Sequence, residues 1–209
     1  MTVSAIILAA GKGTRMRSDR AKVLHEVCGR PMLGYVLDAA TAAGASPVAV
    51  VVGHQADSVK QAFAASEVAW VLQEPQLGTG HAVTVARASV PPDGDVLVLC
   101  GDAPLVRPET LSALIGHHRE TGSAATVLIA EVADPTGYGR VITTADGSVV
   151  DMVEHVDATD EQRQVRDINS SIYAFRAADL FSALADVKND NAKKEYYLPD
   201  VLKVLIERG

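Results

Sequence analysis

The chain has 209 residues, 48% of them hydrophobic, which is enough for one domain with a substantial core and argues against disorder. Its 26 acidic and 19 basic residues give a net charge of −7, which argues against nucleic acid as a partner because a phosphate backbone requires a broad basic surface. No apolar run is long enough to cross a membrane, no signal peptide pattern is present and the 2 cysteines lie far apart, so we expect a cytoplasmic protein with reduced thiols.

The first predicted element is a buried strand over residues 4–10, which runs directly into the glycine turn Gly11–Met16. Two glycines let a bulky anion approach the backbone N–H groups. The cations that follow, opposed by one aspartate, are Lys12, Arg15, Arg17, Arg20 and Lys22. The turn therefore predicts a site for a small polyanion, with a plain turn and solvated cations as the alternative. It lacks P-loop spacing, and Met16 stands where a dinucleotide fingerprint needs a third glycine, so an NAD-dependent oxidoreductase is a weak alternative.

Strand and helix patterns then alternate. Apolar residues at helical spacing follow residue 32 and stop before Gly44, and Pro108 predicts the start of another helix. Further buried strands are predicted over residues 48–52, 95–100 and 124–129. Because these runs are apolar on both faces, we expect an α/β three-layer sandwich of Rossmann-like type, built on a mostly parallel sheet.

Glycines and one carboxylate follow the carboxyl ends of these strands, at Gly11, Gly53 and Gly101-Asp102. Such ends meet at one edge of a parallel sheet, so we expect these residues to converge. Asp102 is well placed to hold Mg²⁺, and a helix-capping or turn aspartate is an equally supported alternative.

A polar loop over residues 73–82 follows a further strand-like pair. The amide of Gln73 can read a base because it donates and accepts together, and the loop glycines let the backbone approach a planar ring. The alternative is an ordinary polar loop in which Thr79 caps a helix that starts near His81.

The pattern changes after about residue 134. Alternating segments at residues 137–142 and 148–153 flank Asp146-Gly147, which predicts a hairpin and a small antiparallel extension covering the site. Glu154 and Asn169 lie beside apolar segments and suit either sugar hydroxyls or ordinary turns. The six histidines lack metal-ligand spacing, and two helical patterns close the chain.

Residues 8–16, followed by Lys22-Val23-Leu24, resemble the signature of sugar-1-phosphate nucleotidyltransferases. Further strings narrow the resemblance to the N-acetylglucosamine-1-phosphate uridylyltransferases; they lie at Gln73 with residues 77–82, and at 101–105, 134–140, 153–159, 168–169 and 191–198. The resemblance covers nearly the whole chain, in order.

The resemblance implies one nucleotidyltransferase domain over residues 1–209, with the nucleotide-diphospho-sugar transferase fold. The implied reaction converts UTP and N-acetylglucosamine 1-phosphate into UDP-N-acetylglucosamine and pyrophosphate, a step toward peptidoglycan and the cell wall. The implied nucleotide contacts are Leu8, Ala9, Ala10, Gly11, Gln73, Gly78 and Thr79. The implied catalytic cations are Arg15 and Lys22, the sugar contacts are Gly101, Gly139, Glu154 and Asn169, and the Mg²⁺ ligand is Asp102.

Two features of the family lie outside these residues. One is a second Mg²⁺ ligand, an asparagine, and the other is a β-helical acetyltransferase domain built of hexapeptide repeats. We therefore expect no acetyl transfer and no trimer through that domain, and the oligomeric state stays open. The alternatives are another sugar specificity, such as glucose 1-phosphate with UTP or dTTP, and a nucleotide-sugar binding module whose incomplete metal site leaves it inactive.

Overall fold

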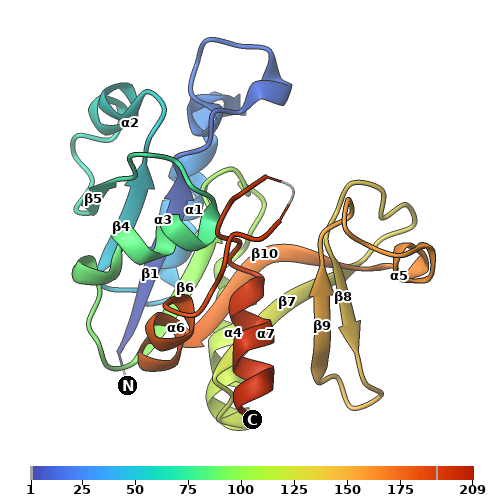
Figure 1. Cartoon of the computed structure of the whole chain (residues 1–209). Helices are drawn as coiled ribbons and strands as arrows, with labels where there is room; N and C mark the ends of the chain where they lie inside the picture. Colours follow the sequence, from blue (N-terminus) through green and yellow to red (C-terminus); the bar gives the residue numbers. More distant parts are fainter. Residues whose placement is uncertain (1, 192) are drawn as a thin grey trace.

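The computed structural model describes residues 2–191 and 193–209, with all of their side chains except that of Arg15, and a mixed sheet lies at its centre (Figure 1). Among these residues the sheet has 8 strands. Four neighbouring strands are parallel, in the spatial order β5 (Ala69–Leu72), β4 (Val48–Val52), β1 (Val3–Ala9) and β6 (Asp95–Cys100). The antiparallel strands are β10 (Asp167–Arg176), which pairs with β6, and β7 (Ala125–Glu131), β8 (Arg140–Thr143) and β9 (Val149–Val153) beyond it.

Helices cover both faces of this sheet, which confirms the predicted α/β three-layer sandwich. One face carries α1 (Met32–Ala42), α2 (Ala56–Ala62) and α4 (Pro108–Thr121). The other face carries α3 (Thr79–Val85), α6 (Ala177–Leu184) and α7 (Asp200–Arg208). Side chains of β1 alternate between the two layers, so that Ile7 packs in the first core and Ile6 in the second. The predicted helix boundaries are confirmed. Pro108 is the first residue of α4, and Gly44, at φ +88°, follows the end of α1.

The antiparallel extension is confirmed as well. Strands β8 and β9 form the predicted hairpin, whose turn contains Gly147 at φ +86°. Figure 1 shows this hairpin and the short helix α5 (Asp160–Gln164) set off from the main body, at the far ends of β7 and β10. A separate small ladder joins β2 (Glu26–Val27) to β3 (Arg30–Pro31).

One predicted strand lies elsewhere in the sheet than expected. The apolar run at residues 124–129, predicted among the buried parallel strands, forms most of β7, which is antiparallel to β10. Its Ile129 is 38% exposed. An apolar run specifies burial but not strand direction, so periodicity could not distinguish the two arrangements.

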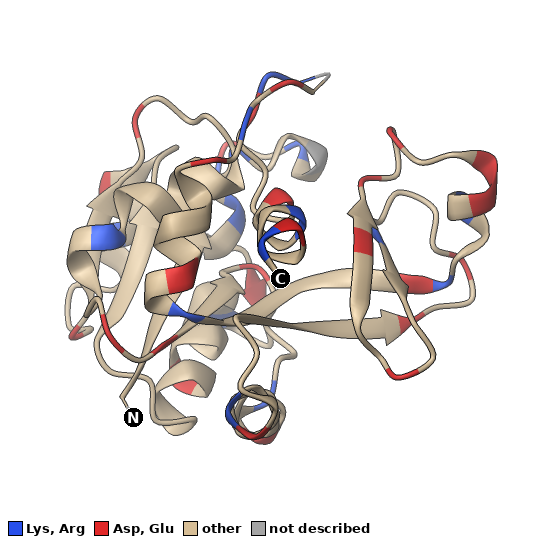
Figure 2. Cartoon of the chain, turned by 60° about the horizontal axis from the view of Figure 1, so that its bottom comes forward, with Lys and Arg blue, Asp and Glu red and all other residues tan. Residues whose placement is uncertain are grey.

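Charged residues of both signs are mixed over the main body and along α7 (Figure 2). No helix among the described residues combines the length and the apolarity that a membrane span requires.

Candidate functional site

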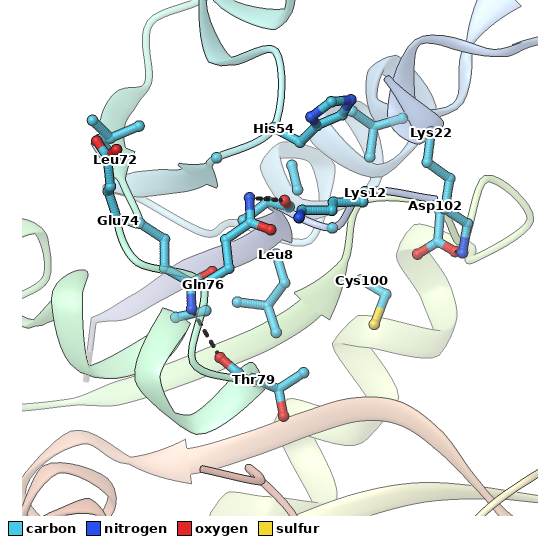
Figure 3. Close-up of a pocket in the computed structure, with 18 of the residues that line it drawn as sticks. Leu8, Lys12, Lys22, His54, Leu72, Glu74, Gln76, Thr79, Cys100 and Asp102 are labelled. Carbon is cyan, nitrogen blue, oxygen red and sulfur yellow. Dashed lines mark hydrogen bonds and ion pairs between the residues drawn. The ribbon is translucent and has the colours of Figure 1, made fainter. Parts of the chain in front are cut away.

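The carboxyl ends of β1, β4, β5 and β6 border a cleft of about 830 Å³ (Figure 3). Gly11, Gly53 and Asp102 all line it, so the predicted convergence at one edge of the sheet is confirmed. All 7 residues predicted to contact a nucleotide line the same cleft, namely Leu8, Ala9, Ala10, Gly11, Gln73, Gly78 and Thr79. The glycine turn and the loop at residues 73–79 thus face one space.

The loop at residues 73–79 is held by contacts with the chain before α7. Gly78 has φ +103°, and a Cβ atom there would lie 2.6 Å from the carbonyl oxygen of Tyr196. The Gly80 N–H donates to that same oxygen at 2.7 Å. Only glycine therefore fits position 78.

Gln73 and Thr79 connect this loop to its own backbone and to the C-terminal segment. Gln73 is buried, and its amide nitrogen donates to the Gly78 carbonyl oxygen at 2.9 Å. Thr79 is the first residue of α3, and its hydroxyl accepts the Leu198 N–H at 2.9 Å. Thr79 therefore ties the loop to the C-terminal segment, and the alternative in which it caps the helix is wrong, because the residue at the N-cap is Gly78.

Lys22 and Asp102 form an ion pair at one side of the cleft (Figure 3). Gly13 leaves room for Lys22 to pack against the glycine turn, because a Cβ atom on Gly13 would lie only 2.7 Å from the Lys22 Cβ atom. Asp102 occupies a turn directly after β6 and caps no helix, since the N-cap of α4 is Arg107. The pair places a positive charge and a hard oxygen ligand side by side.

The remaining predicted residues divide into three cases. The backbone of Arg15 lies in a 3₁₀ turn over Thr14–Met16, and its side chain lies outside the described part of the structure. Gly101 is buried and is not part of the cleft lining, and its N–H donates to the Leu8 carbonyl oxygen at 2.9 Å. The other three, Gly139, Glu154 and Asn169, lie together outside the cleft lining.

These three residues form a compact cluster in the antiparallel part of the fold. A Cβ atom on Gly139 would lie 3.4 Å from Glu154 Oε1 and 3.6 Å from Asn169 Cβ. The Asn169 N–H donates to the Gly139 carbonyl oxygen at 2.9 Å. Burial raises the pKa of Glu154, whose side chain also lines a second cavity of about 520 Å³ between β9 and α7.

Sequence reasoning assigned no individual role to five polar residues that line the cleft, although it counted the first among the cations of the glycine turn; they are Lys12, His54, Glu74, Gln76 and Glu195. The Gln76 amide nitrogen donates to the Ala10 carbonyl oxygen at 2.8 Å. Gly53 leaves room for it, because a Cβ atom there would lie 2.4 Å from Gln76 Nε2. Position in the sequence was the available signal, since Lys12 lies within the glycine turn, His54 follows a glycine at a strand end and Gln76 lies within the polar loop.

Cys100 also lines the cleft, and burial raises the pKa of its thiol to about 11. The thiol therefore stays protonated at neutral pH. Its Sγ atom lies 3.8 Å from the Ser171 carbonyl oxygen, to which it donates. Among the described residues, no group of three or more His, Cys, Asp and Glu side chains is arranged to hold a metal ion.

Comparison with known proteins identifies similar chains. Residues 5–195 match the family model of the MobA-like NTP transferase domain. The chain is 52% identical over 209 residues to the bifunctional protein GlmU of Geobacter metallireducens and 48% identical over 206 residues to that of Halalkalibacterium halodurans. These matches cover 99% and 98% of this chain, which spans 44% and 45% of the two relatives. A solved UDP-glucose pyrophosphorylase complexed with UDP-glucose has the same fold, with a TM-score of 0.83 and 20% identity over 100% of this chain and 88% of that one.

Proposed function

The chain belongs to the family of MobA-like NTP transferase domains, and on this basis we propose that it transfers a uridylyl group from UTP to N-acetylglucosamine 1-phosphate. The products are UDP-N-acetylglucosamine and pyrophosphate. The observation that carries the proposal is that the glycine turn, the loop at residues 73–79 and the Lys22–Asp102 pair meet in one cleft. About half of the residues are identical to those of relatives named GlmU, which supports the same assignment.

In this reaction an oxygen of the sugar phosphate attacks the α-phosphorus of UTP. The bond from that phosphorus to the bridging oxygen breaks, and pyrophosphate leaves with the electron pair. No protein nucleophile is required, so the chain contributes positioning and charge. We assign Lys22 to the phosphates, together with Arg15 because it belongs to the same basic segment, and the N–H groups of the glycine turn approach them.

The base and the sugar are assigned to different parts of the fold. Gln73, Gly78 and Thr79 surround the base in the cleft, where the loop is already held by its contacts with residues 196–198. Glu154 and Asn169 bind the sugar, and Gly139 leaves space between them because it has no side chain.

Mg²⁺ fits the donor set at Asp102. This ion is commonly held by one or two carboxylates together with substrate phosphates, and Asp102 offers one carboxylate at the carboxyl end of β6. When bound, the ion supplies positive charge that offsets the charge of the phosphates.

The test is pyrophosphate release from UTP and N-acetylglucosamine 1-phosphate, measured with Mg²⁺ and with a chelator. We expect Asp102→Ala to abolish turnover and Lys22→Ala to impair it severely, whereas Asp57→Ala, an exposed carboxylate on α2, leaves it unchanged. Glucose 1-phosphate and dTTP, offered in competition, measure the specificity. Tight binding of UDP-N-acetylglucosamine in calorimetry without turnover at any Mg²⁺ concentration would refute the proposal and favour a binding module.

A further inference from the structure

Strand β10 is interrupted beside the cluster of Gly139, Glu154 and Asn169. Its pairing with β7 shifts register between Asn169 and Tyr173. Within this bulge Ser171 has φ +61°, a left-handed conformation that costs energy for a residue with a side chain. The Ser171 N–H donates to Asn169 Oδ1 at 2.8 Å. The bulge therefore holds one donor against the asparagine side chain.

A second donor reaches the same atom. The Tyr173 hydroxyl lies 2.9 Å from Asn169 Oδ1. Since a backbone N–H can only donate, the atom that receives the Ser171 N–H must be the amide oxygen and not the amide nitrogen. The tyrosine hydroxyl therefore donates as well, and both bonds fix the orientation of the Asn169 amide.

The amide nitrogen is left for a ligand. Within the described part of the chain no residue hydrogen bonds to Asn169 Nδ2, and this atom is not among the fully buried ones that lack a partner, so it keeps access to solvent. Glu154 Oε1 lies 3.4 Å from the position that a Cβ atom on Gly139 would take, and Asn169 Cβ lies 3.6 Å from it. The cluster thus offers a donor and an acceptor beside the space that Gly139 leaves open.

Tyr173 itself is held firmly and is not available to a ligand. It is 1% exposed, and its ring stacks on Phe175 with centroids 5.5 Å apart. Burial raises the pKa of its phenol, so the hydroxyl keeps the proton that it donates. Besides Asn169, the hydroxyl has one longer contact, of 4.0 Å, with Met152 Sδ, so the bond to Asn169 is its shorter link to the cluster.

We propose that Tyr173 is a positioning residue for the sugar. Its hydroxyl and the Ser171 N–H together hold Asn169 so that Nδ2 donates to an oxygen of the sugar, such as the acetamido carbonyl, beside the accepting carboxylate of Glu154. This assignment rests on the proposed function, because it takes the sugar phosphate as the ligand of the cluster.

The test compares two substitutions of the same kind. Tyr173→Phe removes the bond to Asn169, and Tyr35→Phe removes a phenol bond of 2.7 Å to the Val27 carbonyl oxygen, in a region remote from the cluster. We expect Tyr173→Phe to raise the KM for the sugar phosphate about three- to tenfold, the range that one hydrogen bond contributes. The kcat value and the KM for UTP stay unchanged, and Tyr35→Phe changes none of the three constants.

A double substitution separates positioning from general stability. In an Asn169→Ala background we expect Tyr173→Phe to have no further effect on the KM for the sugar phosphate. A rise of equal size in that background, or a parallel rise in the KM for UTP, would overturn the proposal. So would an unchanged KM in the single variant.

A spectroscopic measurement decides the role of Tyr173 independently of turnover. The side-chain NH₂ resonances of Asn169, assigned by their loss in Asn169→Ala, are expected to shift in Tyr173→Phe and to stay in place in Tyr35→Phe. Unshifted resonances in Tyr173→Phe refute the positioning role. If the wild-type chain does not convert the two substrates, the proposed function fails, and these resonances still decide whether Tyr173 holds Asn169.

Discussion

Two substitutions of glycine by alanine should have opposite effects in this fold. At position 78 the backbone lies at φ 103° and ψ 177°, a region that is essentially restricted to glycine and costs other residues about 1–3 kcal/mol. The new Cβ atom would also lie 2.6 Å from the Tyr196 carbonyl oxygen. Relieving that clash disturbs two hydrogen bonds: the Tyr196 N–H donates to the Leu77 carbonyl oxygen at 2.8 Å, and the Gly80 N–H donates to the Tyr196 carbonyl oxygen at 2.7 Å. Each bond contributes about 0.5–1.5 kcal/mol. The total cost is therefore about 2–6 kcal/mol.

This cost is measured by urea unfolding together with UTP titration calorimetry. If the substitution rearranges only the loop at residues 73–79, UTP binding weakens by about tenfold or more. If the loop keeps its conformation, the strain lowers the free energy of unfolding instead. The matched control is Gly116→Ala in α4, where a Cβ atom meets nothing within 4 Å. There we expect the free energy of unfolding to rise by about 0.5–1 kcal/mol, because alanine is favoured over glycine in a helix, with UTP binding unchanged. The reasoning is refuted if Gly78→Ala stays within about 0.5 kcal/mol of the wild type in both measurements.

Three further predictions concern charged groups. Lys22→Met removes the partner of Asp102, so in the absence of nucleotide the affinity for Mn²⁺, measured by electron paramagnetic resonance, should rise by up to about fivefold; a weaker affinity would contradict this. Burial lowers the pKa of His118, so the unfolded state binds more protons below about pH 6.5, and the free energy of unfolding should fall there as pH drops. Urea unfolding of His118→Gln should show a smaller fall, and an equal fall would exclude His118 as the cause. Burial raises the pKa of Glu154, so this carboxylate, which we propose accepts from the sugar, is protonated at a higher pH than an exposed glutamate. The KM for the sugar phosphate should therefore rise as pH falls, and Glu154→Gln should remove the part of this dependence that Glu154 causes.

Local patterns were sufficient for the elements that build the cleft. Continuous apolar runs located β4 and β6 at their observed bounds, and the position of Pro108 located the start of α4. The rule that parallel strand ends share an edge then brought Gly53 and Asp102 to the cleft. These predictions succeeded because burial and strand ends are encoded within a few residues.

Long-range contacts were not accessible in the same way. No local pattern indicates that Lys22 pairs with Asp102, 80 positions later, or that Gln76 reaches the Ala10 carbonyl oxygen. The bulge at Ser171 was missed for a related reason, since a serine gives no signal of positive φ as a glycine would. Glu154 and Asn169 stood out only through the family resemblance, because the register of β8, β9 and β10 brings them together.

The pairing of β6 with β10 links the two halves of the proposed site. Tyr173 lies opposite Val98 in this antiparallel ladder, and continuing the register by two residues places Ser171 opposite Cys100. The contact of 3.8 Å between Cys100 Sγ and the Ser171 carbonyl oxygen agrees with that continuation. The bulge in β10 therefore lies opposite Cys100, the last residue of β6, which lines the cleft. After Cys100 the chain turns, and Asp102 lies in that turn. Asp102 lies two residues beyond the end of β6, and Asn169 lies in β10 four residues before the first residue paired with β6. The distance between the proposed metal ligand and the proposed sugar ligand is therefore set by the register of β6 and β10, by the bulge in β10 and by the turn that follows β6.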